Sequence, residues 1–114
     1  MKIRRVVPDL RSADLEAART FYERLGFAEV MNLGWVTTLA SPDNPTAQII
    51  LVRDDEPEPQ PSVSVEVDDV DAVYATLKAT GAEIVYEIRD EPWGVRRFFT
   101  RDPDGHVINV LGHN

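Results

Sequence analysis

The two halves of this sequence repeat one pattern. Residues 54–61 (DDEPEPQP) hold three prolines and four acids, which is typical of a solvated linker, and they separate residues 1–53 from residues 62–114. At a constant offset of 55 residues the matched pairs are Asp14 and Asp69, Glu16 and Asp71, Ala17 and Ala72, Gly26 and Gly81, and Val30 and Val85. A chain of 114 residues has room for one domain. We therefore expect residues 1–114 to form a single domain built from two copies of a module.

Each half carries the signals of one helix of about three turns. Asp14 and Asp69 can accept hydrogen bonds from the free amides of a first turn, and Gly26 and Gly81 can supply the left-handed residue that ends a helix. The apolar positions between these signals recur at helical spacing: Leu15, Ala18, Phe21, Tyr22 and Leu25 in the first half, and Val70, Val73, Tyr74 and Leu77 in the second. We expect both stripes to pack in the core.

Strand patterns surround each helix. One precedes it, at residues 3–7 and 63–67, and three follow it, at residues 27–31, 35–40 and 47–52 and again at 83–89, 95–101 and 107–111. Strict alternation predicts that the valines of 63–67 face the helix, which sends Ser62, Ser64 and Glu66 to the other face. The equivalent face of the last strand carries Val107, Asn109 and Leu111. A four-stranded sheet with one helix buries only one face. We therefore predict an α+β fold in which two βαβββ modules form an eight-stranded, half-open barrel with outer helices. Its inner wall is where we expect a site.

Composition excludes several functions. The absence of cysteine rules out disulfides, thiolate chemistry and cysteine-based metal sites. A formal charge of −8, with the basic residues scattered among acids, disfavours binding to nucleic acid. The longest aliphatic run, residues 49–52, is far short of the roughly 20 residues that a membrane span needs. We expect a cytoplasmic protein.

Three segments carry a resemblance to a known family. They are DLEAARTFYERLGF at 14–27, DDVDAVYATLKATGAEI at 68–84 and RDPDGHVINV at 101–110. Together they resemble the glyoxalase, bleomycin-resistance and extradiol-dioxygenase group, the vicinal oxygen chelate superfamily, over residues 6–111. The resemblance implies the barrel fold, a small-molecule ligand and a homodimer. It leaves the activity open, because the superfamily includes lyases, epimerases, dioxygenases, thiol transferases and proteins that sequester drugs.

The resemblance also shows where metal ligands would lie. Metal-dependent members place a His or Glu seven positions before each helix-opening Asp, and here those positions are Val7 and Ser62. The ligand of the last strand corresponds to Asn109, and the ligand of residues 47–52 has no better candidate than Gln48. A divalent cation needs several charged or imidazole ligands. We therefore predict no metal and no cofactor.

The remaining candidates are side chains that could line the inner wall. Trp35 and Trp93 could stack on a planar ligand, although packing at the rim explains them equally well. One of Arg96 and Arg97 must face the wall, and either could instead form a surface ion pair. The complete set of predicted ligand-binding residues is Trp35, Gln48, Ser62, Ser64, Trp93, Arg97 and Asn109.

Three functions remain open. The first is a metal-free protein that sequesters an aromatic or antibiotic-like molecule by stacking and hydrogen bonding. The second is a metal-dependent lyase or isomerase with unusual ligands such as Gln48, Glu66 or His106. The third is a structural or regulatory dimer with a vestigial cleft. The spacing of the residues shows no catalytic constellation.

Overall fold

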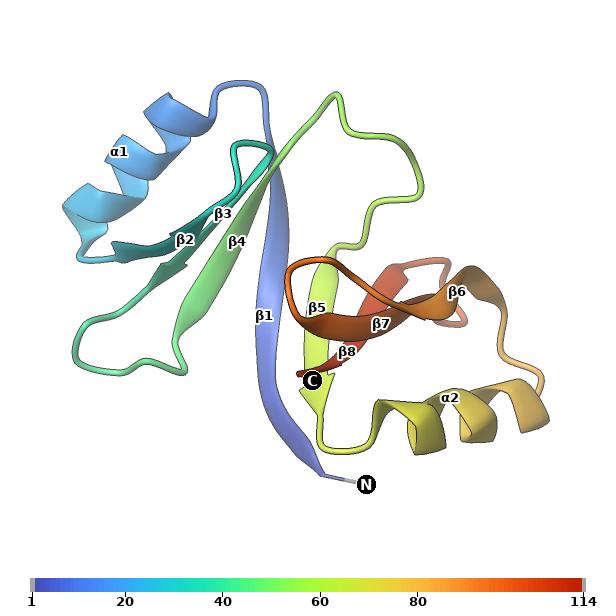
Figure 1. The fold of residues 1–114 in the computed structure, drawn as a ribbon. Helices are drawn as coiled ribbons and strands as arrows, with labels where there is room; N and C mark the ends of the chain where they lie inside the picture. Colours follow the sequence, from blue (N-terminus) through green and yellow to red (C-terminus); the bar gives the residue numbers. More distant parts are fainter. Residues whose placement is uncertain (1, 114) are drawn as a thin grey trace. The chain divides into compact units, whose positions relative to one another are not determined.

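The computed structural model describes residues 2–113, and within them the chain forms eight strands and two helices (Figure 1). Two βαβββ repeats follow one another along the chain. The elements are β1 (Ile3–Ser12), α1 (Leu15–Leu25), β2 (Ala28–Asn32), β3 (Val36–Ala40), β4 (Gln48–Arg53), β5 (Val63–Val67), α2 (Val70–Ala79), β6 (Ile84–Asp90), β7 (Val95–Arg101) and β8 (Val107–His113). The predicted α+β class and the duplicated order of elements are confirmed. No helix of the described residues is long and apolar enough to cross a membrane.

Hydrogen bonding orders the strands β2-β3-β4-β1-β5-β8-β7-β6. The chain divides into two compact units, which we describe separately: the α1 unit, residues 7–58, and the α2 unit, residues 1–6 and 59–114. Strand β1 contributes to both units and is longer than the predicted segment 3–7. Its continuation, residues 9–12, pairs in parallel with β4. The polar residues of this continuation have a low strand propensity, so the sequence pattern does not extend the strand that far. Pairing with β4 stabilises the extended conformation there.

The core of the α1 unit lies between α1 and the face of β3 and β4 beneath it. Leu39, Ile49 and Leu51 form its buried centre. The helix contributes Leu15, Ala18 and Tyr22 to this core.

The prediction that Phe21 and Leu25 pack in the core was wrong. The two side chains are 57% and 65% exposed. Consecutive helix residues point about 100° apart, so Phe21 points away from the side of the helix that carries Leu15, Ala18 and Tyr22. Leu25 lies in the last turn of the helix. The stripe of α1 that packs on the sheet is therefore narrower than the apolar pattern indicates, and its residues are only partly buried.

The core of the α2 unit is built around Phe98, whose exposed fraction is 0%. Val67, Val70 and Val110 complete the buried cluster, and Val65 and Ile108 pack against it. The predicted orientation of β5 and β8 is therefore confirmed: their residues Val65, Val67, Ile108 and Val110 face α2. Their sequence neighbours Ser64, Glu66, Asn109 and Leu111 lie on the opposite face. We call it the open face of the α2 unit because α2 lies on the other side, although Ser64, Asn109 and Leu111 are themselves buried.

The helix ends follow the predicted signals. Asp14 accepts a hydrogen bond from the Ala17 amide and Asp69 accepts one from the Ala72 amide, both at 3.1 Å. Gly26 and Gly81 have φ values of 118° and 84°, in the left-handed region that glycine tolerates.

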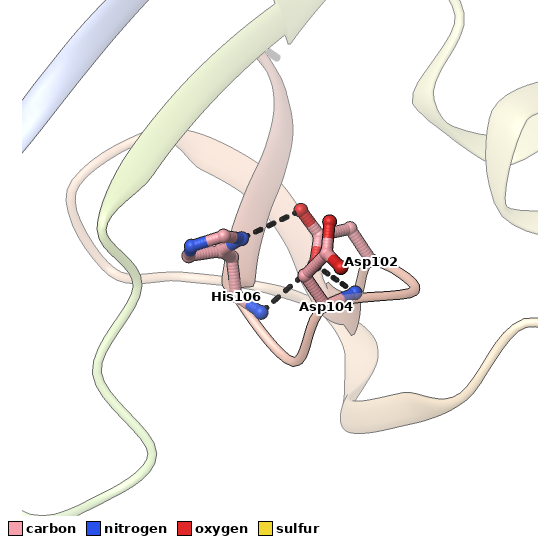
Figure 2. A group of neighbouring side chains, drawn as sticks. All are labelled: Asp102, Asp104 and His106. Atoms are coloured by element: carbon pink, nitrogen blue, oxygen red, sulfur yellow. Dashed lines mark hydrogen bonds and ion pairs between the residues drawn. The ribbon is translucent and has the colours of Figure 1, made fainter.

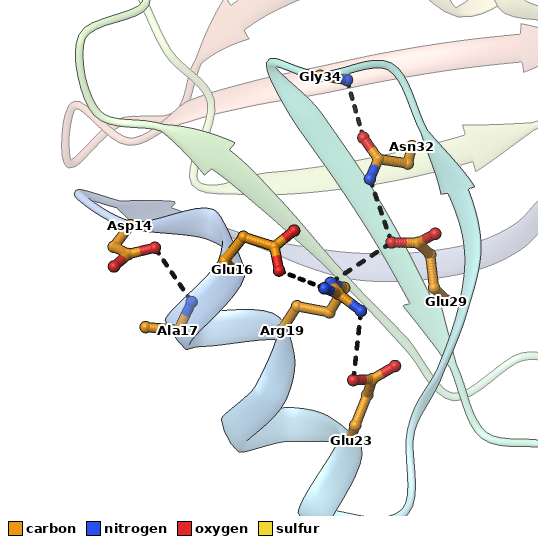
Figure 3. A network of polar contacts seen from close by, with 8 residues as sticks. All are labelled: Asp14, Glu16, Ala17, Arg19, Glu23, Glu29, Asn32 and Gly34. Atoms are coloured by element: carbon orange, nitrogen blue, oxygen red, sulfur yellow. Dashed lines mark hydrogen bonds and ion pairs between the residues drawn. The ribbon is translucent and has the colours of Figure 1, made fainter.

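A polar network holds α1 against β2 (Figure 3). Arg19 contacts Glu16, Glu23 and Glu29, and the side chain of Glu29 in turn accepts a hydrogen bond from Asn32. Because these groups are exposed, the network orients the helix more than it stabilises the fold.

Candidate ligand-binding site

A row of aligned side chains crosses the open face of the α2 unit. Strand pairing places Ser64 beside Asn109, Asn109 beside Phe99, and Phe99 beside Tyr86. The Asn109 amide Nδ2 donates a hydrogen bond to Ser64 Oγ at 3.0 Å, and the rings of Tyr86 and Phe99 stack with centroids 4.6 Å apart. Two predicted site residues, Ser64 and Asn109, therefore lie in direct contact.

Asn109 carries an unsatisfied group. The residue is 8% exposed, and its Oδ1 atom is buried with no hydrogen-bond partner among residues 2–113. Buried polar atoms in folded proteins nearly always have a partner, because leaving one unpaired costs about 1–3 kcal/mol. The row therefore contains one buried acceptor whose hydrogen-bonding capacity no described residue uses.

The neighbouring row is centred on Arg97. Pairing places Glu66 beside Leu111, Leu111 beside Arg97, and Arg97 beside Arg89. This resolves the choice between the two adjacent arginines. Arg96 faces α2, where its guanidinium bonds Asp71 at 3.0 Å, so Arg97 belongs to the open face.

Three aromatic rings surround the Arg97 guanidinium. Its central carbon lies 4.8 Å from the ring centre of Phe99, 5.0 Å from Trp93 and 5.2 Å from Tyr86. Such contacts attract a cation to the ring face and hold the planar group in place. We call Tyr86, Glu91, Trp93, Arg97 and Phe99 the Arg97 cluster. The structure therefore brings the predicted residue Trp93 together with Arg97.

Glu91 anchors this cluster and is not among the site residues predicted from the sequence. Its side chain is 2% exposed. Its Oε2 atom accepts hydrogen bonds from Arg97 Nε at 2.8 Å and from the Tyr86 hydroxyl at 2.9 Å, while its Oε1 atom pairs with Arg89. In the sequence, Glu91 reads as a turn residue before Pro92. One sequence signal does point to Glu91: it is an acid close in sequence to Arg89 and Arg97, two strand arginines that each need an anionic partner.

Glu66 forms a second polar group on the open face. Its carboxylate pairs with Arg5 on one oxygen and with His113 Nδ1, at 2.8 Å, on the other. Burial alone raises the pKa of Glu66, but the hydrogen bonds from His113 and Arg5 outweigh it, so the pKa lies below its ordinary value. A shallow depression of about 320 Å³ adjoins this group and is lined by Arg4, Glu66, Val67, Asp68 and His113.

The lowered pKa of Glu66 predicts a loss of stability in acid. A carboxyl whose pKa is lower in the folded chain stabilises the fold above its unfolded value, about 4.3, and this contribution disappears as the pH falls through the folded value. In urea unfolding, we expect wild type to exceed Glu66→Gln in stability near pH 6, and the difference to shrink near pH 3. A difference that does not depend on pH would contradict this role of the charge.

The other predicted residues occupy different places. Trp35 and Gln48 belong to the α1 unit. Trp35 is partly buried directly before β3, and Gln48 donates its side-chain amide to the carbonyl of Pro45 at 2.8 Å. Ser62 is exposed just before β5, where its amide donates to the carbonyl of Val107.

The residues at the family's metal positions do not fit a divalent cation. Val7 has no donor atom and is 1% exposed. Ser62 is a neutral hydroxyl, and Asn109 and Gln48 offer neutral amide oxygens. Divalent cations bind carboxylates and imidazoles far better than isolated neutral groups. This donor set therefore offers too little negative charge.

One other group of potential ligands lies in the turn between β7 and β8 (Figure 2). Ligand atoms of Asp102, Asp104 and His106 lie within 4.8 Å of one another. The turn itself uses Asp102, which accepts the amides of Asp104 and His106 on one oxygen and pairs with the His106 ring on the other. Burial alone raises the pKa of Asp102, but these hydrogen bonds outweigh it and lower the pKa. The group therefore serves to close an exposed turn.

The order of elements places this chain in the class of proteins built from two βαβββ modules. The chain belongs to the glyoxalase/bleomycin resistance protein/dioxygenase superfamily, whose family model matches residues 2–110. The predicted resemblance is confirmed. No curated protein matches the sequence at a significant level.

Solved structures share this fold. A Legionella pneumophila protein described as an NAD-dependent benzaldehyde dehydrogenase is 16% identical, with a TM-score of 0.75 over 96% of this chain and 99% of that one. An uncharacterised protein from Methanosarcina mazei is 27% identical, with a TM-score of 0.71 over 100% and 95% of the two chains. A superfamily member from Vibrio splendidus is 19% identical, with a TM-score of 0.67 over 97% and 99%.

Proposed function

We propose that this protein binds a small aromatic or antibiotic-like molecule without a metal and acts by sequestering it. The observation that carries the proposal is the pair formed by Asn109 and Ser64. Asn109 stands where metal-dependent members of the superfamily place a carboxylate, and its buried Oδ1 atom is left without a partner among the described residues. A neutral acceptor at this position suits a ligand that donates a hydrogen bond better than it suits a cation.

The Arg97 cluster supports an aromatic ligand. Small-molecule sites are mostly apolar and aromatic, with a few polar groups that fix the orientation of the ligand, and this cluster provides that mixture. Trp93 is partly buried and is the predicted stacking surface. The proposal keeps Trp35, Gln48 and Ser62 as further contact residues, each testable by substitution.

A homodimer and a cytoplasmic location complete the proposal. Proteins of this superfamily bind small molecules and commonly form dimers. The exposed apolar side chains of α1, β2 and the turn after β2 are the candidates for a partner surface, because exposed apolar residues that gather in one patch mark interaction sites. They are Phe21, Leu25, Val30, Met31 and Leu33.

The alternative is a metal-dependent lyase or isomerase. The proximity of Asp102, Asp104 and His106 is the observation in its favour. Glu66 supports it poorly, since both of its carboxylate oxygens are already paired.

Thermal unfolding distinguishes the two functions. In a screen of aromatic metabolites and antibiotics with the metal-stripped protein, we expect a ligand present at about 100 times its Kd to raise Tm by about 10 °C or more. The reason is that a ligand that binds only the folded state adds its binding free energy to stability. Addition of zinc, manganese or nickel should leave the shift unchanged.

The opposite result supports the enzyme. A shift that requires a divalent cation, together with stoichiometric metal in the purified protein, would exclude the metal-free proposal. A screen without any saturable shift would favour a vestigial cleft.

A further inference from the structure

We propose that the open face of the α2 unit recognises an aromatic carboxylic acid, with its carboxylate on Arg97 and a ring hydroxyl on Asn109. The inference rests on the proposed function and specifies the chemical class of the ligand. It depends on three features of the α2 unit: the free edge of the Arg97 guanidinium, the local balance of charge and the spacing of the polar groups.

The Arg97 guanidinium has one edge committed and one available. Its Nε and Nη2 atoms both lie against Glu91 Oε2, at 2.8 and 2.7 Å. Its Nη1 atom has no hydrogen bond to any residue between Lys2 and His113. A guanidinium presents two parallel donors along its outer edge, and a carboxylate matches them with both oxygens. The end of Arg97 formed by Nη1 and Nη2 is therefore a place for a second carboxylate.

The surroundings hold this edge still. Glu91 is buried and fixes the inner edge, while the rings of Phe99, Trp93 and Tyr86 lie near the guanidinium carbon. A fixed guanidinium loses little side-chain entropy when it binds an anion, which favours affinity. We treat Glu91 as a positioning residue, because it acts on the ligand through Arg97.

The local charge favours an anion although the whole chain is acidic. In the part of the chain that the structure describes, Arg5, Arg89 and Arg97 pair with Glu66 and Glu91, and Arg101, two residues after Phe99 on β7, pairs with Glu83. These four arginines and three carboxylates leave one positive charge in excess within a chain of formal charge −8. A cationic ligand, which the net charge alone would suit, meets the wrong sign here.

The spacing of the polar groups selects a planar ring between them. Asn109 lies opposite Phe99, and Arg97 is two residues before Phe99 on the same strand, so Asn109 and Arg97 are diagonal neighbours. A benzene ring with substituents at opposite ends would lie between these two positions, with its carboxylate accepting hydrogen bonds from Arg97 and its hydroxyl donating to Asn109 Oδ1. The adjacent rings of Phe99 and Trp93 provide apolar contact for such a ligand.

The first test changes the ligand and leaves the protein intact. In NMR titrations of the metal-stripped wild-type protein, 4-hydroxybenzoate should bind roughly tenfold or more tightly than its neutral analogue 4-hydroxybenzamide, because only the acid forms charged hydrogen bonds with Arg97. Benzoate, which lacks the hydroxyl, should bind roughly fivefold or more weakly than 4-hydroxybenzoate. A higher salt concentration should weaken the binding of the two acids and leave the binding of the amide unchanged.

Variants assign the contact to Arg97. Arg97→Lys keeps a positive charge beside Glu91 but removes the two-donor edge, so binding of 4-hydroxybenzoate should weaken roughly tenfold while 4-hydroxybenzamide is unchanged. The matched control is Arg96→Lys, which alters the neighbouring arginine on the helix side and should change neither affinity. Circular dichroism confirms folding of both variants.

Two failures are distinguishable. Equal affinities for acid and amide, or an unchanged affinity in Arg97→Lys, would overturn the assignment of an aromatic acid while leaving metal-free binding intact. If ring compounds bind only after a divalent cation is added, the proposed metal-free function itself is contradicted.

Discussion

Replacement of Phe98 by alanine lowers the free energy of unfolding by about 3–5 kcal/mol. Phe98 has no exposed surface and lies at the centre of the α2-unit core, between Val67, Val70 and Val110. It also meets the ring of Tyr74 edge-on, with centroids 4.9 Å apart. The substitution therefore removes the transfer free energy of a whole ring and leaves a cavity that the strands cannot close. Urea unfolding monitored by circular dichroism measures the loss.

Phe21→Ala is the matched control. The same atoms are removed from a side chain that is 57% exposed, so we expect a loss below about 1 kcal/mol. The sequence pattern, which assigns Phe21 to the core, would have predicted a large loss for this variant as well. Comparable losses at the two positions in a monomeric sample would contradict the structure. A large loss at Phe21 that depends on protein concentration would instead place this side chain in a dimer interface.

The second large effect is expected for Glu91→Ala, at about 3 kcal/mol or more. The change leaves Arg97 and the Tyr86 hydroxyl without their buried acceptor and opens space beneath them. Arg89 moderates the loss, because its side chain is mostly exposed and can be solvated. Urea unfolding gives the free energy, and Trp93 fluorescence reports separately on whether the Arg97 cluster has loosened.

Glu83→Ala provides the comparison for an exposed acid. Glu83 pairs with Arg101 at 3.1 Å, and both side chains reach solvent. Exposed pairs of this kind contribute about 0–1 kcal/mol, so the variant should remain close to wild type. Equal losses of unfolding free energy in Glu83→Ala and Glu91→Ala would contradict the prediction, because burial would then add nothing to the contacts of Glu91.

The local signals in the sequence predicted most of the framework. Asp14 and Asp69 cap the two helices as expected, since a cap depends on residues three positions apart in the chain. The faces of β5 and β8 also follow from alternation, which assigned Ser64 and Asn109 to the inner face, while their contact comes from the pairing of the two strands. Capping and alternation act over a few residues, so the sequence carries them directly.

Several features of the candidate site could not be predicted in this way. Alternation allowed either Arg96 or Arg97 to face the wall, and the choice became clear only when Arg96 met Asp71 of α2. Glu91 looked like an ordinary turn acid, yet it is the buried partner of Arg97. Phe21 belonged to an apolar stripe and nevertheless points away from the α1-unit core.

By itself, the sequence determined a duplicated α+β chain with two capped helices, and it showed that the family's metal positions hold residues with few donor atoms. Only the tertiary structure decided that Arg97, Glu91 and three aromatic rings form one cluster next to the buried Asn109 oxygen. The physical reason is the range of the interactions. Helix caps and strand alternation arise between near neighbours, whereas burial and ion pairing depend on which strands lie side by side.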